Sequence, residues 1–181
     1  MISVSPSTFT KVEYRLDQIV PVVEEVQSSI GAGTSLAEAD IELVIDEDQP
    51  TARMSIRSLD PIVFALDSGA FEDTRNPREF GVEIASVTVA SLCIEYLDRT
   101  SEAFGAPGLG EPTDLADKIA WSVYTHARVA RAGYRVHKPK HLYNFRNRHG
   151  FSDAADHAFE TLWSGKDLDY AQILGCCPRR P

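Results

Sequence analysis

The feature that most constrains the fold is a long, nearly uninterrupted apolar helix signal between residues 76 and 99. Asn76 is a preferred helix cap, Pro77 suits the first helical position, and Glu79 can complete a capping box. One stripe of this segment at helical spacing consists of Val82, Ala85, Val89, Leu92, Cys93 and Tyr96. Further apolar side chains cover the neighbouring faces, and a helix that is apolar on most sides must be buried. We therefore expect residues 82–97 to form a buried central helix.

The elements before this helix are one helix and three short strands. Apolar residues at helical spacing predict a helix over residues 16–30, which Gly31 ends. Three apolar runs of strand length follow, at residues 41–45, 52–57 and 62–66. The first two are separated by an acidic turn and read as a hairpin. Three consecutive strands with short connections indicate an antiparallel meander.

The second half of the chain is predicted to be helical. A loop rich in Gly, Pro and Ala at residues 101–112 precedes a second long helix over residues 113–132. Residues 135–150 read as irregular, and two shorter helices follow at 152–164 and 167–174. Because strands and helices are segregated, the fold class is α+β, with a small three-stranded antiparallel sheet packed with two long helices and several short ones. A mainly-α fold is the alternative, since helices cover about half of the chain.

The length and the cysteine count set the expected organisation and compartment. A chain of 181 residues predicts a single globular domain over residues 1–175 and a short flexible tail at 176–181, which includes Cys176 and Cys177. Three cysteines fit a reducing compartment, so we expect a cytoplasmic protein. The N-terminus has no basic start followed by an apolar stretch, and no run approaches the roughly 20 apolar residues of a membrane helix.

Charge is distributed unevenly along the chain, whose net formal charge is −9. Residues 1–116 carry 21 Asp or Glu against 7 Lys or Arg. Residues 118–152, which we call the basic segment, contain no Asp or Glu, eight Lys or Arg and four of the five histidines. Folding does not require such asymmetry, so it points to the surface that contacts a partner.

The candidate residues for binding an anion or a partner all lie in this basic segment. They are Arg128, Arg131, Arg135, Lys138, Lys140, Arg146, Arg148 and Tyr143. Arg128, Arg131 and Arg135 would share one face at the end of the second long helix, where cations also complement the helix dipole. Tyr143 and Phe145 are either a stacking platform for a partner or anchors into the core of the protein. Nucleic acid is a less favoured partner, because the rest of the acidic surface would repel it.

The histidines suggest a second possibility, a metal site. Its candidate ligands are His137, His141, His149, Asp153 and His157. His149, Asp153 and His157 follow one another at spacings of four, which permits two histidines and a carboxylate to converge. Pro139 argues against an interior helical turn between His137 and His141. The alternative without a metal is that these are surface or hydrogen-bonded histidines.

No recognisable catalytic or nucleotide-binding motif is present. The sequence therefore favours a cytosolic binding or assembly module over an enzyme, and it implies no cofactor and no membrane. Its basic segment would dock an anionic protein partner or the acidic surface of another copy, giving a homo-oligomer. The alternative is an enzyme that uses the histidines for metal or acid–base chemistry and the arginines to orient an anionic substrate.

Overall fold

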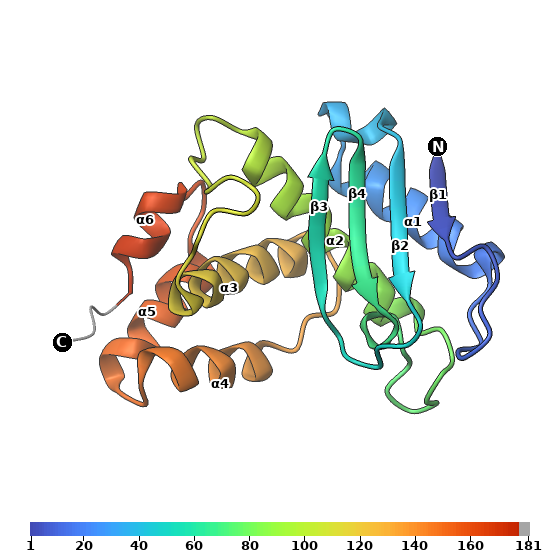
Figure 1. The fold of residues 1–181 in the computed structure, drawn as a ribbon. Helices are drawn as coiled ribbons and strands as arrows, with labels where there is room; N and C mark the ends of the chain where they lie inside the picture. The colour runs from blue at the N-terminus through green and yellow to red at the C-terminus, as the bar shows by residue number, and fades with distance from the viewer. Residues whose placement is uncertain (178–181) are drawn as a thin grey trace. The chain divides into compact units, whose positions relative to one another are not determined.

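The computed structural model describes residues 1–177, and the chain divides into two compact units, Met1–Leu97 (unit 1) and Asp98–Pro181 (unit 2). Among the described residues there are one four-stranded sheet and six α-helices (Figure 1), so the predicted α+β class is confirmed. None of the helices within residues 1–177 is long and apolar enough to cross a lipid bilayer. The single domain expected over residues 1–175 stays a prediction.

Unit 1 is built on a mixed sheet with the strand order β1-β2-β4-β3. The strands are β1 (Ile2–Ser5), β2 (Ile41–Asp46), β3 (Met54–Leu59) and β4 (Ile62–Asp67). β1, β2 and β4 run parallel, whereas β3 is antiparallel to β4. Parallel neighbours require a crossover, and helix α1 (Leu16–Ile30) supplies it between β1 and β2.

The predicted three-stranded antiparallel meander is wrong in two respects. The sheet has a fourth strand, β1, and β2 pairs with β4 instead of forming a hairpin with β3. The reason lies in the composition of the strands. β4 is apolar in almost every position and is buried at the centre of the sheet, whereas β3 carries exposed Ser55 and Arg57 and lies at the edge. The only tight hairpin in unit 1 joins β3 to β4 through Asp60 and Pro61.

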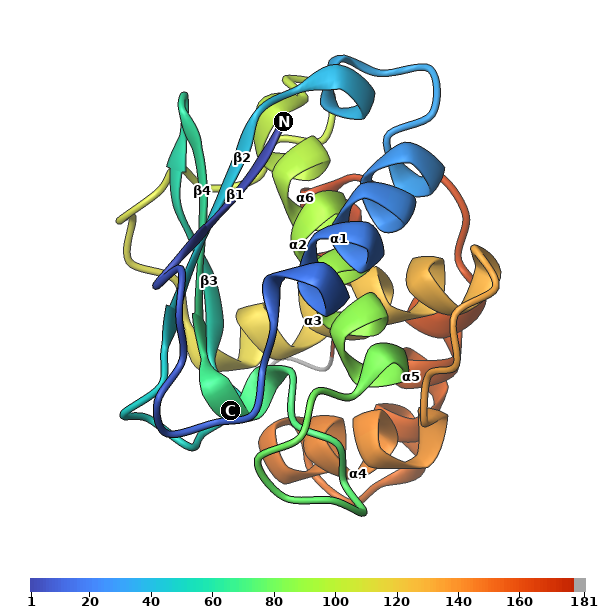
Figure 2. The same ribbon diagram turned by 90° about the vertical axis from the view of Figure 1, so that its right-hand side faces the viewer.

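Helices α1 and α2 (Val82–Thr100) lie on the same face of the sheet (Figure 2). Alternate residues of β2 and β4, among them Leu43 and Phe64, are fully buried, as are Val89 and Leu92 of α2. The prediction of a buried central helix is confirmed for residues 85–94, whereas Val82 at its start is 57% exposed. Unit 1 places no helix on the other face of the sheet (Figure 2). We call it the polar face, because Asp46, Asp67 and Ser55 lie there, together with the apolar Val44, Val63 and Ala65.

The predicted start of α2 at Asn76 is wrong, since the helix begins at Val82. Residues 76–79 form a turn in which the Glu79 amide donates to the Asn76 carbonyl oxygen at 3.1 Å. Glu79 and Phe80 then take part in isolated β-bridges with Glu13 and Glu72. Their backbone groups are committed to these bridges, so the helix starts only after Gly81.

Unit 2 contains four helices that follow the last turn of α2. They are α3 (Leu115–Arg131), α4 (Lys138–His149), α5 (Asp153–Ser164) and α6 (Tyr170–Gly175). The side chains of their shared core include Phe104, Trp121, Tyr124, Phe145, Phe159, Leu162 and Ile173. The helices expected over 113–132, 152–164 and 167–174 are thus confirmed within a few residues at their ends.

Helix α4 is the main secondary-structure correction, because residues 135–150 were expected to be irregular. Pro139 occupies the second position of the helix, where a missing amide hydrogen costs little. The side chain of His137 caps the helix by accepting a hydrogen bond from the Lys140 amide at 3.3 Å. The proline therefore starts this helix instead of preventing it.

The C-terminal residues are only partly described. Cys176 and Cys177, which fall in the predicted tail, are partly buried and pack against the core of unit 2. Residues 178–181 of that tail lie outside the described part of the chain.

Candidate functional site

Two cations of the basic segment pair with carboxylates of α5. Arg146 donates from Nε to Oδ1 of Asp156 at 2.7 Å, and its Nη2 reaches Oδ2. Lys138 donates from Nζ to Oε2 of Glu160 at 2.7 Å and lies over the rings of Phe159 and Trp163. These two side chains therefore fasten α4 to α5 within unit 2.

Arg128 is committed to a buried cluster. Its guanidinium makes a bidentate pair with Asp98, whose carboxylate also accepts a hydrogen bond from Trp121 Nε1 at 2.8 Å. The guanidinium carbon lies 4.7 Å from the Tyr124 ring centre and 5.7 Å from that of Phe104. Burial raises the pKa of Asp98, and the contact with Arg128 opposes that rise. The position of Arg128 is that of a structural ion pair.

The expected cationic face formed by Arg128, Arg131 and Arg135 is not realised. α3 ends at Arg131, and Gly133 adopts a left-handed conformation with φ of 97°. Arg135 therefore lies beyond the helix and off its face. Arg131 donates from Nη1 to the Trp163 carbonyl oxygen at 2.9 Å.

The remaining part of the basic segment forms one exposed helical face. Lys140, Tyr143, Asn144, Asn147 and Arg148 are exposed and lie at i, i+3, i+4, i+7 and i+8, so they share the outward side of α4. Within the described residues, the side chains of Lys140 and Arg148 form no ion pair, and no carboxylate lies on this face of the helix. We call these five residues together with Phe151 the α4 outer face.

Two aromatic side chains give this face its apolar part. Tyr143 is 59% exposed and Phe151 is 67% exposed, and their rings meet edge to face with centres 6.1 Å apart. Phe145, by contrast, is fully buried in the unit 2 core. Of the two aromatic residues considered in the sequence, one is thus a core anchor and the other belongs to the surface.

The five candidate metal ligands are used in different places. His137 caps α4, and His141 packs against the ring of His126. His149 donates from Nε2 to the Ala116 carbonyl oxygen at 3.1 Å and stacks on Phe145. Asp153 and His157 are exposed on α5. No group of three or more His, Cys, Asp or Glu able to hold a metal is found within residues 1–177.

The basic segment also contains two neighbouring imidazole rings with shifted pKa values, those of His126 and His141, whose planes are tilted by 36°. The ring centres are 4.0 Å apart. Burial, together with the nearby charges of His126, Lys140 and His137, lowers the pKa of His141 to about 3. Burial also lowers the pKa of His126, whose Nδ1 donates to the Ser122 carbonyl oxygen at 2.8 Å. Both rings are therefore neutral in the folded protein near neutral pH.

This pair makes the folded protein sensitive to mild acid. Below about pH 6.5 the unfolded chain protonates the His141 imidazole, whereas the folded chain does so only near pH 3, so stability falls as the pH falls toward 3. The lowered pKa of His126 acts in the same direction. We expect the His141 imidazole to lower the free energy of unfolding by about 1.4 kcal/mol per pH unit in this range. Urea unfolding at several pH values should show a flatter slope for His141→Gln than for wild type. An unchanged slope in His141→Gln, matching the exposed control His157→Gln, would contradict this assignment.

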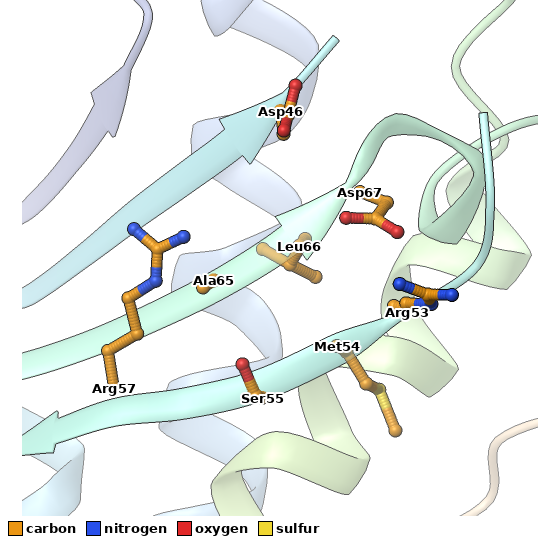
Figure 3. A pocket seen from close by; sticks show the side chains of 8 residues that line it. All are labelled: Asp46, Arg53, Met54, Ser55, Arg57, Ala65, Leu66 and Asp67. Carbon is orange, nitrogen blue, oxygen red and sulfur yellow. The ribbon is translucent and has the colours of Figure 1, made fainter. Parts of the chain in front are cut away.

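A second site was not identified from the sequence, on the polar face of the unit 1 sheet (Figure 3). A pocket of about 370 Å³ lies there over β2, β3 and β4. Its outward-facing side chains are Asp46, Arg53, Ser55, Arg57, Ala65 and Asp67. The alternation of Arg53, Ser55 and Arg57 in the sequence indicates a polar side of β3. The sequence did not reveal the pairing of β2 with β4, which brings Asp46 beside Asp67.

Comparison of the chain with family models, curated proteins and solved structures finds no match in any of the three.

Proposed function

We propose that this protein is a binding module that docks an acidic protein segment on the α4 outer face. The observation that carries the proposal is an exposed aromatic pair, Tyr143 and Phe151, bordered by two cations that have no partner within the described residues. Aromatic residues and arginine are enriched in protein interfaces and supply most of the residues that dominate binding energy.

The internal pairing of the neighbouring cations supports this choice of surface. Arg128, Lys138 and Arg146 are held by carboxylates of their own unit, which accounts for their presence without a partner. Lys140 and Arg148 have no such explanation, and they lie on the same exposed side of α4 as Tyr143. An acidic partner would neutralise them, while its apolar groups would cover the rings.

Charge also favours an acidic polypeptide over nucleic acid. The sequence of unit 1 carries 17 Asp or Glu against 6 Lys or Arg, a formal charge of −11, whereas unit 2 has a formal charge of +2. A polyanion as long as a nucleic acid would be repelled by most of the chain. A short acidic segment needs only the α4 outer face, and the acidic unit of a second copy has the same chemistry.

The proposal predicts a specific loss of binding when Tyr143 is truncated. A fluorescent peptide of alternating Glu and Leu should bind the wild-type protein at low salt, and Tyr143→Ala should weaken that binding about tenfold or more. Leu115→Ala is the matched control, since Leu115 is 46% exposed on α3 and lies outside this face. Equal binding by both variants would contradict the proposal.

Two further experiments distinguish an acidic protein segment from a nucleic acid and from a second copy of the chain. Because exposed charges are screened beyond about 10 Å at 0.1 M ionic strength, added salt should weaken peptide binding. A single-stranded oligonucleotide of equal charge should bind more weakly than the peptide. Sedimentation at low and high salt then shows whether the acidic partner is a second copy of the chain, in which case the mass falls as salt is added.

A further inference from the structure

The pocket on the polar face of the unit 1 sheet has an arrangement of charges that folding does not account for. Asp46 and Asp67 are directly opposed at the carboxyl ends of the parallel strands β2 and β4. Like charges placed opposite each other on neighbouring strands destabilise a sheet. Within the described residues, neither carboxylate forms an ion pair.

Each of these carboxylates is held in place by a neighbouring donor. Asp67 accepts a hydrogen bond from the Thr51 hydroxyl, and its amide donates to the Arg53 carbonyl oxygen at 2.9 Å. Asp46 accepts from the Asp48 amide through Oδ1 at 2.9 Å. One oxygen of each carboxylate is engaged in this way, and within residues 1–177 the other oxygen accepts no hydrogen bond.

The opposite charge comes from the edge strand β3. Arg53 and Arg57 are exposed, and within the described residues neither guanidinium has a hydrogen-bond or ion-pair partner. Arg57 sits at a β-bulge, because the register shifts between Ile56 and Ser58 and leaves Arg57 unpaired. Bulges redirect side chains and are common beside binding sites. Figure 3 shows the Arg57 side chain extending from β3 across β4, beside Ala65.

Between these charged groups the pocket is lined by residues with small side chains. Ala65 lies in the middle of the pocket and is 7% exposed, with Ser55 directly across from it on β3. Ala65 and Asp67 are two residues apart on one strand, a separation of roughly 7 Å. The pocket thus has the Arg57 guanidinium at one end and two carboxylates at the other, about one dipeptide length apart, with Arg53 also lying at the carboxylate end beside Asp67 (Figure 3).

We propose that this pocket binds a small zwitterion of dipeptide length, with its carboxylate on Arg57 and its ammonium group on Asp46 and Asp67. A guanidinium binds a carboxylate through two parallel hydrogen bonds. The ammonium group removes the repulsion between the two aspartates, and the backbone of the ligand lies over Ala65 and Ser55. Arg53 lies beside Asp67 at the carboxylate end and contributes a second cation to the pocket (Figure 3). A volume of about 370 Å³ is in the range of small-ligand pockets.

The test is a titration of the full-length, ¹⁵N-labelled protein with three matched probes, followed by NMR. Glycylglycine carries both charges, acetyl-glycylglycine lacks the ammonium group, and glycylglycinamide lacks the carboxylate. We expect glycylglycine at millimolar concentrations to shift the amide signals of Ser55, Ala65 and Asp67. Each blocked probe should bind about tenfold more weakly, because one charge-assisted contact is lost.

Two single-residue variants test which side chain binds each charged end of the ligand. Arg57→Gln should remove the advantage of glycylglycine over glycylglycinamide, whereas Asp46→Asn should remove its advantage over acetyl-glycylglycine. Arg75→Gln is the control, since Arg75 is exposed in unit 1 outside the pocket. The proposal is overturned if glycylglycine leaves these amides unshifted, or if the three probes bind equally. It is also overturned if Mg²⁺ alone shifts the same amides and Arg57→Gln changes nothing, which would show a cation site.

Discussion

Replacing Asp98 with alanine should lower the free energy of unfolding by about 3–5 kcal/mol, the cost of breaking a buried ion pair by removing one partner. The carboxylate side chain is only 4% exposed, and it accepts hydrogen bonds from Arg128 and Trp121. Without it, the guanidinium of Arg128 stays between Phe104 and Tyr124 with no counter-charge. Urea unfolding of wild type and variant measures the effect.

The double variant Asp98→Ala/Arg128→Ala provides the control for this prediction. If the cost arises from an uncompensated charge, removing Arg128 as well should cost less than the sum of the two single changes. Simple additivity, or a loss below about 1 kcal/mol in Asp98→Ala, would show that the pair contributes little to unit 2.

The second large effect concerns the central helix of unit 1. Leu92 is fully buried on α2, and Leu92→Ala should cost about 2–5 kcal/mol through lost burial and the cavity left behind. Val82→Ala on the same helix is the matched control, because Val82 is 57% exposed and should change stability by no more than about 0.5 kcal/mol. Similar losses in the two variants would contradict the assignment of α2 as the centre of the core.

The central helix could be predicted because its signal is local. The apolar stripe through Val89 and Leu92 can be recognised from the spacing of neighbouring residues, and so can the glycines that follow α1 and α3. The start of α2 was misplaced because Asn76 and Pro77 are good helix starters in isolation. The bridges of Glu79 and Phe80 to distant residues prevent a helix there, and no local pattern reports them.

The sheet was predicted less well because strand order depends on contacts between distant residues. Three strands were found, but a hairpin was expected between β2 and β3 because they are consecutive. The strongly apolar β4 takes the central place instead, and β1 completes the parallel part of the sheet. The pocket of Asp46 and Asp67 depends on this pairing, so it could not be seen in the sequence.

The sequence pointed to the segment that contains the proposed binding surface, but not to the separate roles of its residues. The absence of carboxylates between residues 118 and 152 singled out the segment. It did not show that Arg146 would meet Asp156 or that Lys138 would meet Glu160, because both partners lie beyond the segment. The helical period of α4 then separates inward Phe145 from outward Tyr143.

This separation permits a matched test of the central claim that the α4 outer face is a docking surface. Two double variants remove the same number of charges from one helix, namely Lys140→Gln/Arg148→Gln on the outer face and Lys138→Gln/Arg146→Gln at the internal pairs. We compare their Tm and their binding of the Glu–Leu peptide at low salt.

The account predicts that Lys140→Gln/Arg148→Gln keeps or raises Tm and loses peptide binding by about tenfold or more, since outer-face repulsion is relieved and partner contacts are lost. Lys138→Gln/Arg146→Gln should lower Tm and keep most of the binding. The opposite pattern, in which the outer-face variant loses stability while its affinity for the peptide is unchanged, would contradict the account.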